Sequence, residues 1–215
     1  MQFAAVVLTP ARVVQISCRI VPRRRKRGLA LNADPEFVRG SRLLEEAYEL
    51  AVDAHHGARR RNDTDVDHPV AVAMLLEERG FDDEVVAAAL LHEVLEDTAT
   101  ERSEITDRFG PGVAELVRVM TEDASIEPYE ERKAEHRARV ADYSTRAAAI
   151  YAADKLAKTR ALHHDEGGNL SEAKLDHYRR TLIELQEAHP ELPFLEDLEE
   201  ALQDLDADRQ HAARS

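Results

Sequence analysis

The chain of 215 residues is long enough for one compact domain with a short appendage, and its 33% charged and 5% aromatic residues, without tryptophan, are typical of a helical protein. Its formal charge of −14 argues against a nucleic-acid-binding function, because an acidic surface repels phosphate backbones. A single cysteine, Cys18, excludes an internal disulfide and fits a reducing, cytoplasmic compartment, and no apolar run approaches the roughly 20 residues needed to cross a membrane.

The N-terminal segment differs in charge from the rest of the chain. Residues 1–33 hold seven basic residues and no acidic one, so the remainder has a net charge of −21. Arg12 and Arg19 interrupt the apolar residues, and the basic cluster at 23–27 follows them, which is the reverse of the order in a secretion signal. We expect residues 1–35 to be a disordered basic extension. The alternatives are a membrane-surface or targeting segment and an upstream start codon that the cell does not use.

Helical periodicity begins near residue 34 and continues to the end of the chain. The predicted helices span residues 36–57, 70–79, 83–97, 101–109, 112–120, 129–141, 145–162, 171–188 and 194–207. The first of these helices could instead restart at Gly40-Ser41, and the strongly charged helix at 129–141 is expected to be exposed. The sequence shows no alternating strand pattern, no repeat and no glycine-rich phosphate loop, so the predicted fold class is all-α. We expect the helices of residues 166–215 to pack on the domain formed by residues 36–165.

The predicted third helix carries the first unusual polar group. His92, Glu93, Glu96 and Asp97 follow an entirely apolar run, residues 85–91. In a continuous helix these four side chains occupy one arc of the surface. Crowded there, they would repel and desolvate one another without a cation. The alternative is that the helix leaves the core at this point and the four are solvated end residues.

Asp154 is a second polar residue in apolar surroundings. It follows seven apolar residues, 147–153, so the sequence predicts that it is buried. A buried carboxylate needs a partner, which could be Lys155, Arg160 or a metal ion.

His68 precedes Pro69 at the start of the predicted second helix, where a histidine could simply mark the helix boundary. Together, the three segments supply two imidazoles and two carboxylates, a mixed nitrogen and oxygen set that suits Mn, Fe, Co or Zn. The other histidines considered are interpreted as structural or solvated: His55, His56, His136, His163 and His164.

These residues occur in an order that resembles a known superfamily. The motifs are Ala54-His55-His56-Gly57, His68-Pro69, the run from Ala88 to Thr98, Phe109-Gly110, and Ala153-Asp154-Lys155-Leu156. Together they resemble the HD superfamily, and most of all the hydrolase domain of RelA/SpoT proteins and the small alarmone hydrolases. The resemblance covers roughly residues 43–165.

The resemblance implies a compact multi-helix bundle with a metal site in its centre and a divalent ion, typically Mn²⁺. The implied metal ligands are His68, His92, Glu93 and Asp154. Glu96 and Asp97 match the acidic pair that lies beside the attacking water. The implied reaction removes the 3′-pyrophosphate from guanosine tetraphosphate or pentaphosphate by metal-activated water. The implied partner is thus a small phosphorylated nucleotide.

The substrate pocket departs from the family pattern. The His-Asp doublet is His92-Glu93 here, and Lys158 replaces the asparagine expected four residues after Asp154. Arg59, Arg60 and Arg61 are expected to contact the substrate together with Lys158, although the arginines could equally form a solvated loop.

Three alternative functions therefore stay open. The chain could be an HD hydrolase of a different phosphorylated molecule, a non-catalytic nucleotide-binding regulatory relic, or a helical interaction module without a metal. The sequence does not indicate an oligomeric state.

Overall fold

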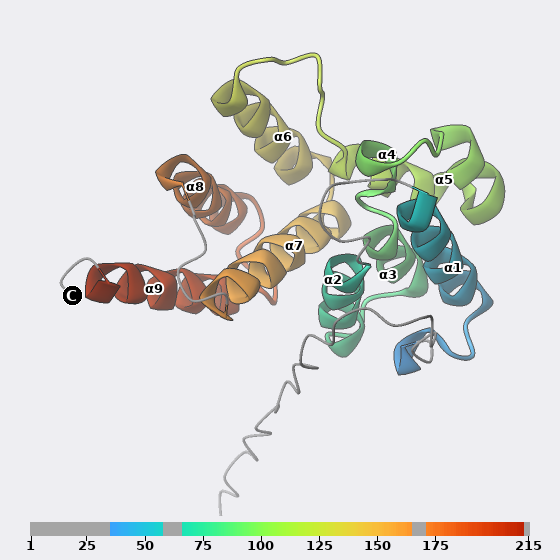
Figure 1. The fold of residues 1–215 in the computed structure, drawn as a ribbon, viewed down its shortest axis with the longest axis horizontal. Helices are drawn as coiled ribbons and strands as arrows, with labels where there is room; N and C mark the ends of the chain where they lie inside the picture. The colour runs from blue at the N-terminus through green and yellow to red at the C-terminus, as the bar shows by residue number, and fades with distance from the viewer. Residues whose placement is uncertain (1–34, 58–65, 165–170, 213–215) are drawn as a thin grey trace, which may run out of the picture. The chain divides into compact units, whose positions relative to one another are not determined.

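The computed structural model describes residues 35–57, 66–164 and 171–212, and all the regular structure within these ranges is helical (Figure 1). The helices are the 3₁₀ helix Glu36–Val38, α1 (Arg42–Gly57), α2 (Asp67–Glu78), α3 (Asp83–Leu90), α4 (Val94–Asp97), α5 (Arg102–Met120), α6 (Tyr129–Tyr143), α7 (Thr145–His164), α8 (Glu172–Ala188) and α9 (Leu195–Ala212). The predicted all-α class is confirmed. Residues 34–215 form one compact unit, and the predicted extension, residues 1–35, lies outside the described residues except for Pro35.

Helix α3 is the centre of the first half of the fold. Every residue from Val85 to Leu90 is buried, and the helix contacts α1, α2, α5 and α7. Its N-terminus is capped by Asp82, whose carboxylate accepts a hydrogen bond of 3.1 Å from the backbone N–H of Val85. A helix that is apolar on all sides must be covered on all sides, which explains its four neighbours.

Helix α7 lies between the group of α1 to α5 and the group of α6, α8 and α9 (Figure 1). It contacts α2, α3 and α5 as well as α6, α8 and α9. The residues from Ala147 to Ala153 are buried, and five of these seven are alanines, whose small side chains let neighbouring helices approach closely. This packing places Asp154, in the middle of α7, next to the ends of α2 and α3.

The predicted continuous helix at 83–97 is wrong. Helix α3 ends at Leu90, its C-cap is Leu91 (φ −104°, ψ 1°), and the turn of residues 91–93 leads into the short α4. Both sides of the turn contact the core, so the apolar pattern continues through it and gives no sign of the break. The single helical arc predicted for the four polar residues therefore does not exist.

The predicted helices 101–109 and 112–120 are confirmed as the two parts of α5, which are separated by a kink at Gly110, where the backbone is non-helical (φ 83°, ψ 168°). One further element differs from the prediction. Helix α6 is not simply exposed, because His136, Arg137 and Val140 are buried where it packs on α7 and α8.

Within the described ranges, no helix combines the length and the apolar character needed to cross a membrane.

Candidate metal centre

Three separate elements bring four polar side chains to one place. His68 lies in the first turn of α2, His92 and Glu93 lie in the turn between α3 and α4, and Asp154 lies in the middle of α7. Glu93 has φ −97° and ψ −7°, near the sparsely populated bridge region in which many active-site residues occur. The break after α3 therefore turns His92 and Glu93 toward α2 and α7.

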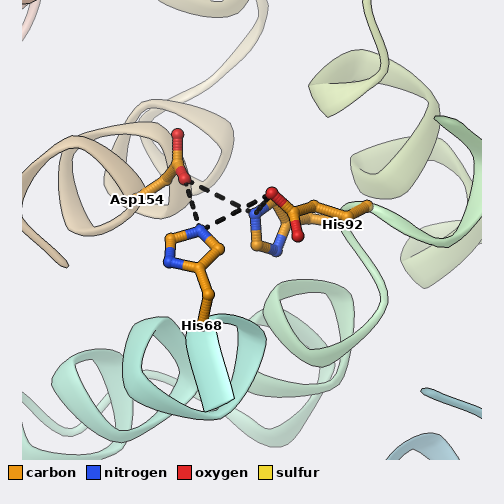
Figure 2. A group of neighbouring side chains, drawn as sticks. His68, His92 and Asp154 are labelled. Carbon is orange, nitrogen blue, oxygen red and sulfur yellow. Dashed lines mark hydrogen bonds and ion pairs between the residues drawn. The ribbon is translucent and has the colours of Figure 1, made fainter. Parts of the chain in front are cut away.

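The ligand atoms of these four residues all lie within 4.8 Å of one another. His68 Nε2 is 2.8 Å from Asp154 Oδ1, and His92 Nε2 is 3.5 Å from the same oxygen (Figure 2). Glu93 Oε1 is 3.7 Å from His68 Nε2 and 3.8 Å from His92 Nε2. Nitrogen and oxygen ligands about 2.0–2.2 Å from one transition-metal ion are themselves separated by roughly 3–3.5 Å, so the arrangement fits a shared ion.

The imidazole of His92 is prepared to act as a ligand. Its Nδ1 is 2.7 Å from the carbonyl oxygen of Ala89, to which it donates its proton, so Nε2 is the ring nitrogen available to a metal ion. His92 is only 4% exposed, and its Nε2 is buried without a hydrogen-bonding partner. A buried nitrogen of this kind is costly unless a cation or a donor meets it, so the residues present fit a metal ion.

Lysines also neutralise the carboxylates of the site. Lys155 Nζ lies 2.6 Å from Asp154 Oδ2, and Lys158 Nζ lies 2.8 Å from Asp154 Oδ1 and 3.3 Å from Glu93 Oε1. Burial by itself would raise the pKa of Asp154, but the charges of Lys155 and Lys158 outweigh it and hold that pKa well below its usual range. Of the two side chains predicted as possible partners of Asp154, Lys155 does form an ion pair with one of its oxygens. Arg160 lies beside Asp197 instead. Neither lysine makes a hydrogen bond with His92 Nε2.

The acidic pair lies in α4, at the edge of the site. Glu96 Oε1 accepts a hydrogen bond of 2.5 Å from the backbone N–H of Glu122. Partial burial raises the pKa of Glu96, and the nearby carboxylate of Glu122 adds to this shift. Asp97 lines an open pocket beside α1 together with Asp53 and Glu104. Arg59, Arg60 and Arg61 lie outside the described residues.

Two cationic side chains that the sequence did not single out, Lys133 and Lys174, join the predicted Lys155 and Lys158 in one group. We call it the lysine cluster: Lys133, Lys155, Lys158 and Lys174. Lys155 is buried, with its Nζ 4.2 Å from the centre of the Tyr151 ring and 5.7 Å from that of Tyr178. Burial and the charges of Lys158, Lys155 and Lys133 lower the pKa of Lys174. Lys133 and Lys174 lie on charged helices, where lysine is common, so their spacing gave no signal.

Comparisons with known proteins agree with the arrangement of the site. The HD domain family matches residues 47–178, a range that contains all four clustered side chains. A guanosine-3′,5′-bis(diphosphate) 3′-pyrophosphohydrolase of Aquifex aeolicus is 42% identical over 94 residues, which are 43% of this chain and 13% of that protein. The chain thus spans about an eighth of that relative's length.

Shorter relatives are covered more fully. The Danio rerio protein named guanosine-3′,5′-bis(diphosphate) 3′-pyrophosphohydrolase MESH1 is 34% identical over 126 residues, which are 56% of this chain and 69% of that protein. A solved structure described as a metazoan ortholog of SpoT that hydrolyzes ppGpp superposes with a TM-score of 0.65 at 30% identity. That superposition covers 76% of this chain and 95% of the other.

Proposed function

The chain belongs to the HD domain family, and we propose that it is a metal-dependent phosphohydrolase that removes pyrophosphate from guanosine 3′,5′-bis(diphosphate). The observation that carries this proposal is the convergence of His68, His92, Glu93 and Asp154, with the Nε2 of His92 buried and without a hydrogen bond. A divalent ion held by these four residues would acidify a water molecule and neutralise phosphate charge. The relatives' names supply the substrate.

The metal is proposed to be Mn²⁺ and the compartment to be the cytoplasm. The mixed imidazole and carboxylate set supports a transition metal, since calcium and magnesium prefer oxygen ligands alone. The family resemblance favours manganese among the metals that the set suits.

Glu96 and Asp97 are proposed to orient the attacking water and to take its proton. The raised pKa of Glu96 moves that carboxylate closer to the range in which it can exchange a proton near neutral pH. Glu96 also binds the backbone N–H of Glu122, a contact that fixes the direction of its carboxylate.

The lysine cluster is proposed to bind the phosphates that are not cleaved. Lys155 and Lys158 lie against Asp154, and their charges and that of Lys133 act on Lys174. In a protein whose formal charge is −14, such a local concentration of positive charge attracts a polyphosphate. Lys158 is the member closest to the carboxylates of the site. Arg59, Arg60 and Arg61 are proposed to add further positive charge at the substrate.

A second candidate is hydrolysis of a different phosphorylated nucleotide. Lys158 binds both Glu93 and Asp154, at a position where the RelA/SpoT resemblance leads us to expect asparagine. A cation in place of an amide favours a substrate with more negative charge near that position.

The test is hydrolysis by the full chain after chelation and reconstitution with Mn²⁺, with products separated by ion-exchange chromatography. We expect GDP and pyrophosphate from the wild-type protein, and a loss of at least about 100-fold in kcat/KM for His92→Gln. Asp142→Asn, which changes an exposed carboxylate on α6, is the control and should retain full activity. Hydrolysis of other nucleotides but not of guanosine 3′,5′-bis(diphosphate) would favour the second candidate, and no hydrolysis of any of them would contradict both.

A further inference from the structure

The connection between α5 and α6, residues 121–128, begins beside α4, the helix that carries Glu96 (Figure 1). The backbone N–H of Glu122 donates the hydrogen bond of 2.5 Å to Glu96 Oε1. The direction of the Glu96 carboxylate therefore depends on where the backbone of Glu122 is held.

Helix α6 holds this connection through two arginines. Arg139 Nη2 donates a hydrogen bond of 3.0 Å to the carbonyl oxygen of Thr121. Arg132 Nη1 donates a hydrogen bond of 2.8 Å to the carbonyl oxygen of Ile126. Hydrogen bonds from a charged donor are among the stronger ones in proteins, so both ends of the connection are fixed to α6.

The side chain of Glu122 also contacts α6. Its Oε2 accepts a hydrogen bond of 3.0 Å from Arg132 Nε, and its Oε1 forms an ion pair with the ammonium group of Lys133. All three side chains are at most 24% exposed, so water screens these contacts less than it screens pairs on the open surface. Glu122 thus contacts a catalytic acid through its backbone and a lysine through its side chain.

Lys133 belongs to the lysine cluster, which is proposed to bind the phosphates that are not cleaved. Its charge acts on Lys174, another member of the cluster. An ammonium group has three donors, so Lys133 can bind Glu122 and a phosphate oxygen at the same time. The contacts then form a chain that runs from the phosphate through Lys133 and Glu122 to Glu96.

We propose that Glu122 is a positioning residue that makes the rate of hydrolysis depend on the uncleaved phosphates of the substrate. A phosphate bound to Lys133 immobilises that flexible side chain, and the ion pair then fixes Glu122 and the N–H that orients Glu96. Binding energy from a remote part of the substrate is thus used to orient a catalytic group, which raises kcat and not only affinity. The inference rests on the proposed function and adds a residue that discriminates between substrates with and without a second group of phosphates.

The experiment compares guanosine 3′,5′-bis(diphosphate) with guanosine 3′-diphosphate, which keeps the bond that is cleaved and lacks the 5′ phosphates. We measure kcat and KM with Mn²⁺ for the full chain and for Glu122→Gln, which keeps the backbone N–H and removes the charge that pairs with Lys133. We expect the wild-type kcat to be at least about tenfold higher on the complete substrate, and Glu122→Gln to remove most of this difference. Glu127→Gln removes an exposed carboxylate from the same connection and should retain the difference.

A purely structural role of Glu122 gives a different result. An equal loss of kcat on both compounds in Glu122→Gln would mean that Glu122 only stabilises the connection, and would overturn the proposal. A wild-type kcat that is the same on both compounds would also overturn it. If circular dichroism shows that Glu122→Gln does not fold, Glu122→Asp takes its place, because it shortens the reach to Lys133 and should also reduce the difference.

A second measurement does not need hydrolysis. The backbone amide at position 122 is followed by nuclear magnetic resonance while inorganic pyrophosphate is added to the metal-free full chain. We expect its resonance to shift in the wild type and in Glu127→Gln, and to stay in place in Glu122→Gln. Hydrolysis of both compounds without this shift in the wild type would overturn the coupling alone. Absence of hydrolysis of either compound would contradict the proposed function, on which the coupling rests.

Discussion

Glu93 is the residue at which the site departs from the His-Asp doublet of the family that the sequence resembles. Its side chain is one methylene longer than aspartate, yet its Oε1 lies 3.7 Å from His68 Nε2. Burial by itself would raise the pKa of Glu93, but the charges of His92, Lys158 and His68 outweigh it and lower that pKa. The longer side chain is thus paired with Lys158, the other departure from the family pattern.

Shortening Glu93 tests whether the site has adapted to the longer side chain. We predict that Glu93→Asp lowers kcat/KM on the true substrate by about 10–100-fold, because a displacement of about 1 Å at a catalytic site can cost on the order of 10²-fold. The measurement compares both proteins, with added Mn²⁺, on alarmones, other nucleotides and a generic phosphodiester. A large gain on the alarmone alone would show that Glu93 damages an inherited site. Absence of activity in both proteins on every compound would favour the regulatory alternative.

At the scale of single residues, much of the candidate site could be predicted from the sequence. His92, Glu93 and Asp154 were predicted because polar groups in apolar segments need partners. His68 joined them because it completes a mixed ligand set and matches the family motif, and the structure brings the four together. Lys133 and Lys174 were not identified, because a lysine on a charged helix looks the same whether it faces water or a site.

At the scale of elements, the helices and the kink in α5 were predictable, whereas the break after α3 was not. Helix α7 (Thr145–His164) agrees closely with the predicted helix at 145–162 because its apolar residues are continuous. The break at Leu91–Glu93 was not predicted, because the residues around it are buried on both sides. The buried face of α6 was missed because the charges along this helix conceal its partner, α8.

The kink in α5 leads to a prediction about two glycines. Gly110 has φ 83°, and an added Cβ would meet nothing within 4 Å there, so Gly110→Ala should cost only the backbone strain, about 1–3 kcal/mol. At Gly112 an added Cβ would lie 3.3 Å from Glu84 Oε2, a flexible side-chain atom that can move. Gly112→Ala should therefore be neutral or should stabilise by up to about 1 kcal/mol. Urea unfolding of both variants is the measurement, and equal effects would contradict the explanation.

The interface of α6, α7 and α8 predicts how stability depends on pH. Burial, assisted by the charge of Lys155, lowers the pKa of His136 to about 3 and that of His177 to about 2. In the unfolded chain both should titrate near 6.5, so between about pH 6.5 and pH 3 the unfolded state binds more protons. The stabilisation is full above about pH 6.5 and is lost as the pH falls.

The measurement is the free energy of unfolding in urea between about pH 7.5 and pH 5.5. Each histidine contributes at most about 1.4 kcal/mol per pH unit below its unfolded pKa. His177→Gln should therefore reduce the slope by up to this amount. A variant with the slope of the wild type would show that His177 accepts a proton in the folded state.

At the scale of the whole molecule, residues 34–215 form one compact unit. Composition and periodicity were sufficient to predict its all-α class. They could not predict which helices are neighbours, because α7 contacts partners that are distant in the sequence. The division into an extension (1–35), a catalytic domain (36–165) and C-terminal helices (166–215) stays a proposal.

Removal of residues 1–33 tests part of this division. Their basic charge and interrupted apolar residues match no packed helix, so a chain that begins at Asp34 should fold and hydrolyse substrate like the full chain. The measurements are the free energy of unfolding and kcat/KM. A loss of more than about 3 kcal/mol would contradict the prediction, because it exceeds what a frayed terminus contributes.

The most direct test of the central claim is the metal content of the purified protein and of two variants. The account predicts at least one tightly held transition-metal ion per wild-type chain. It also predicts loss of that ion in His92→Ala and in Asp154→Ala, because each change deletes a ligand. Full metal occupancy in both variants would show that the ion is not bound by His68, His92, Glu93 and Asp154.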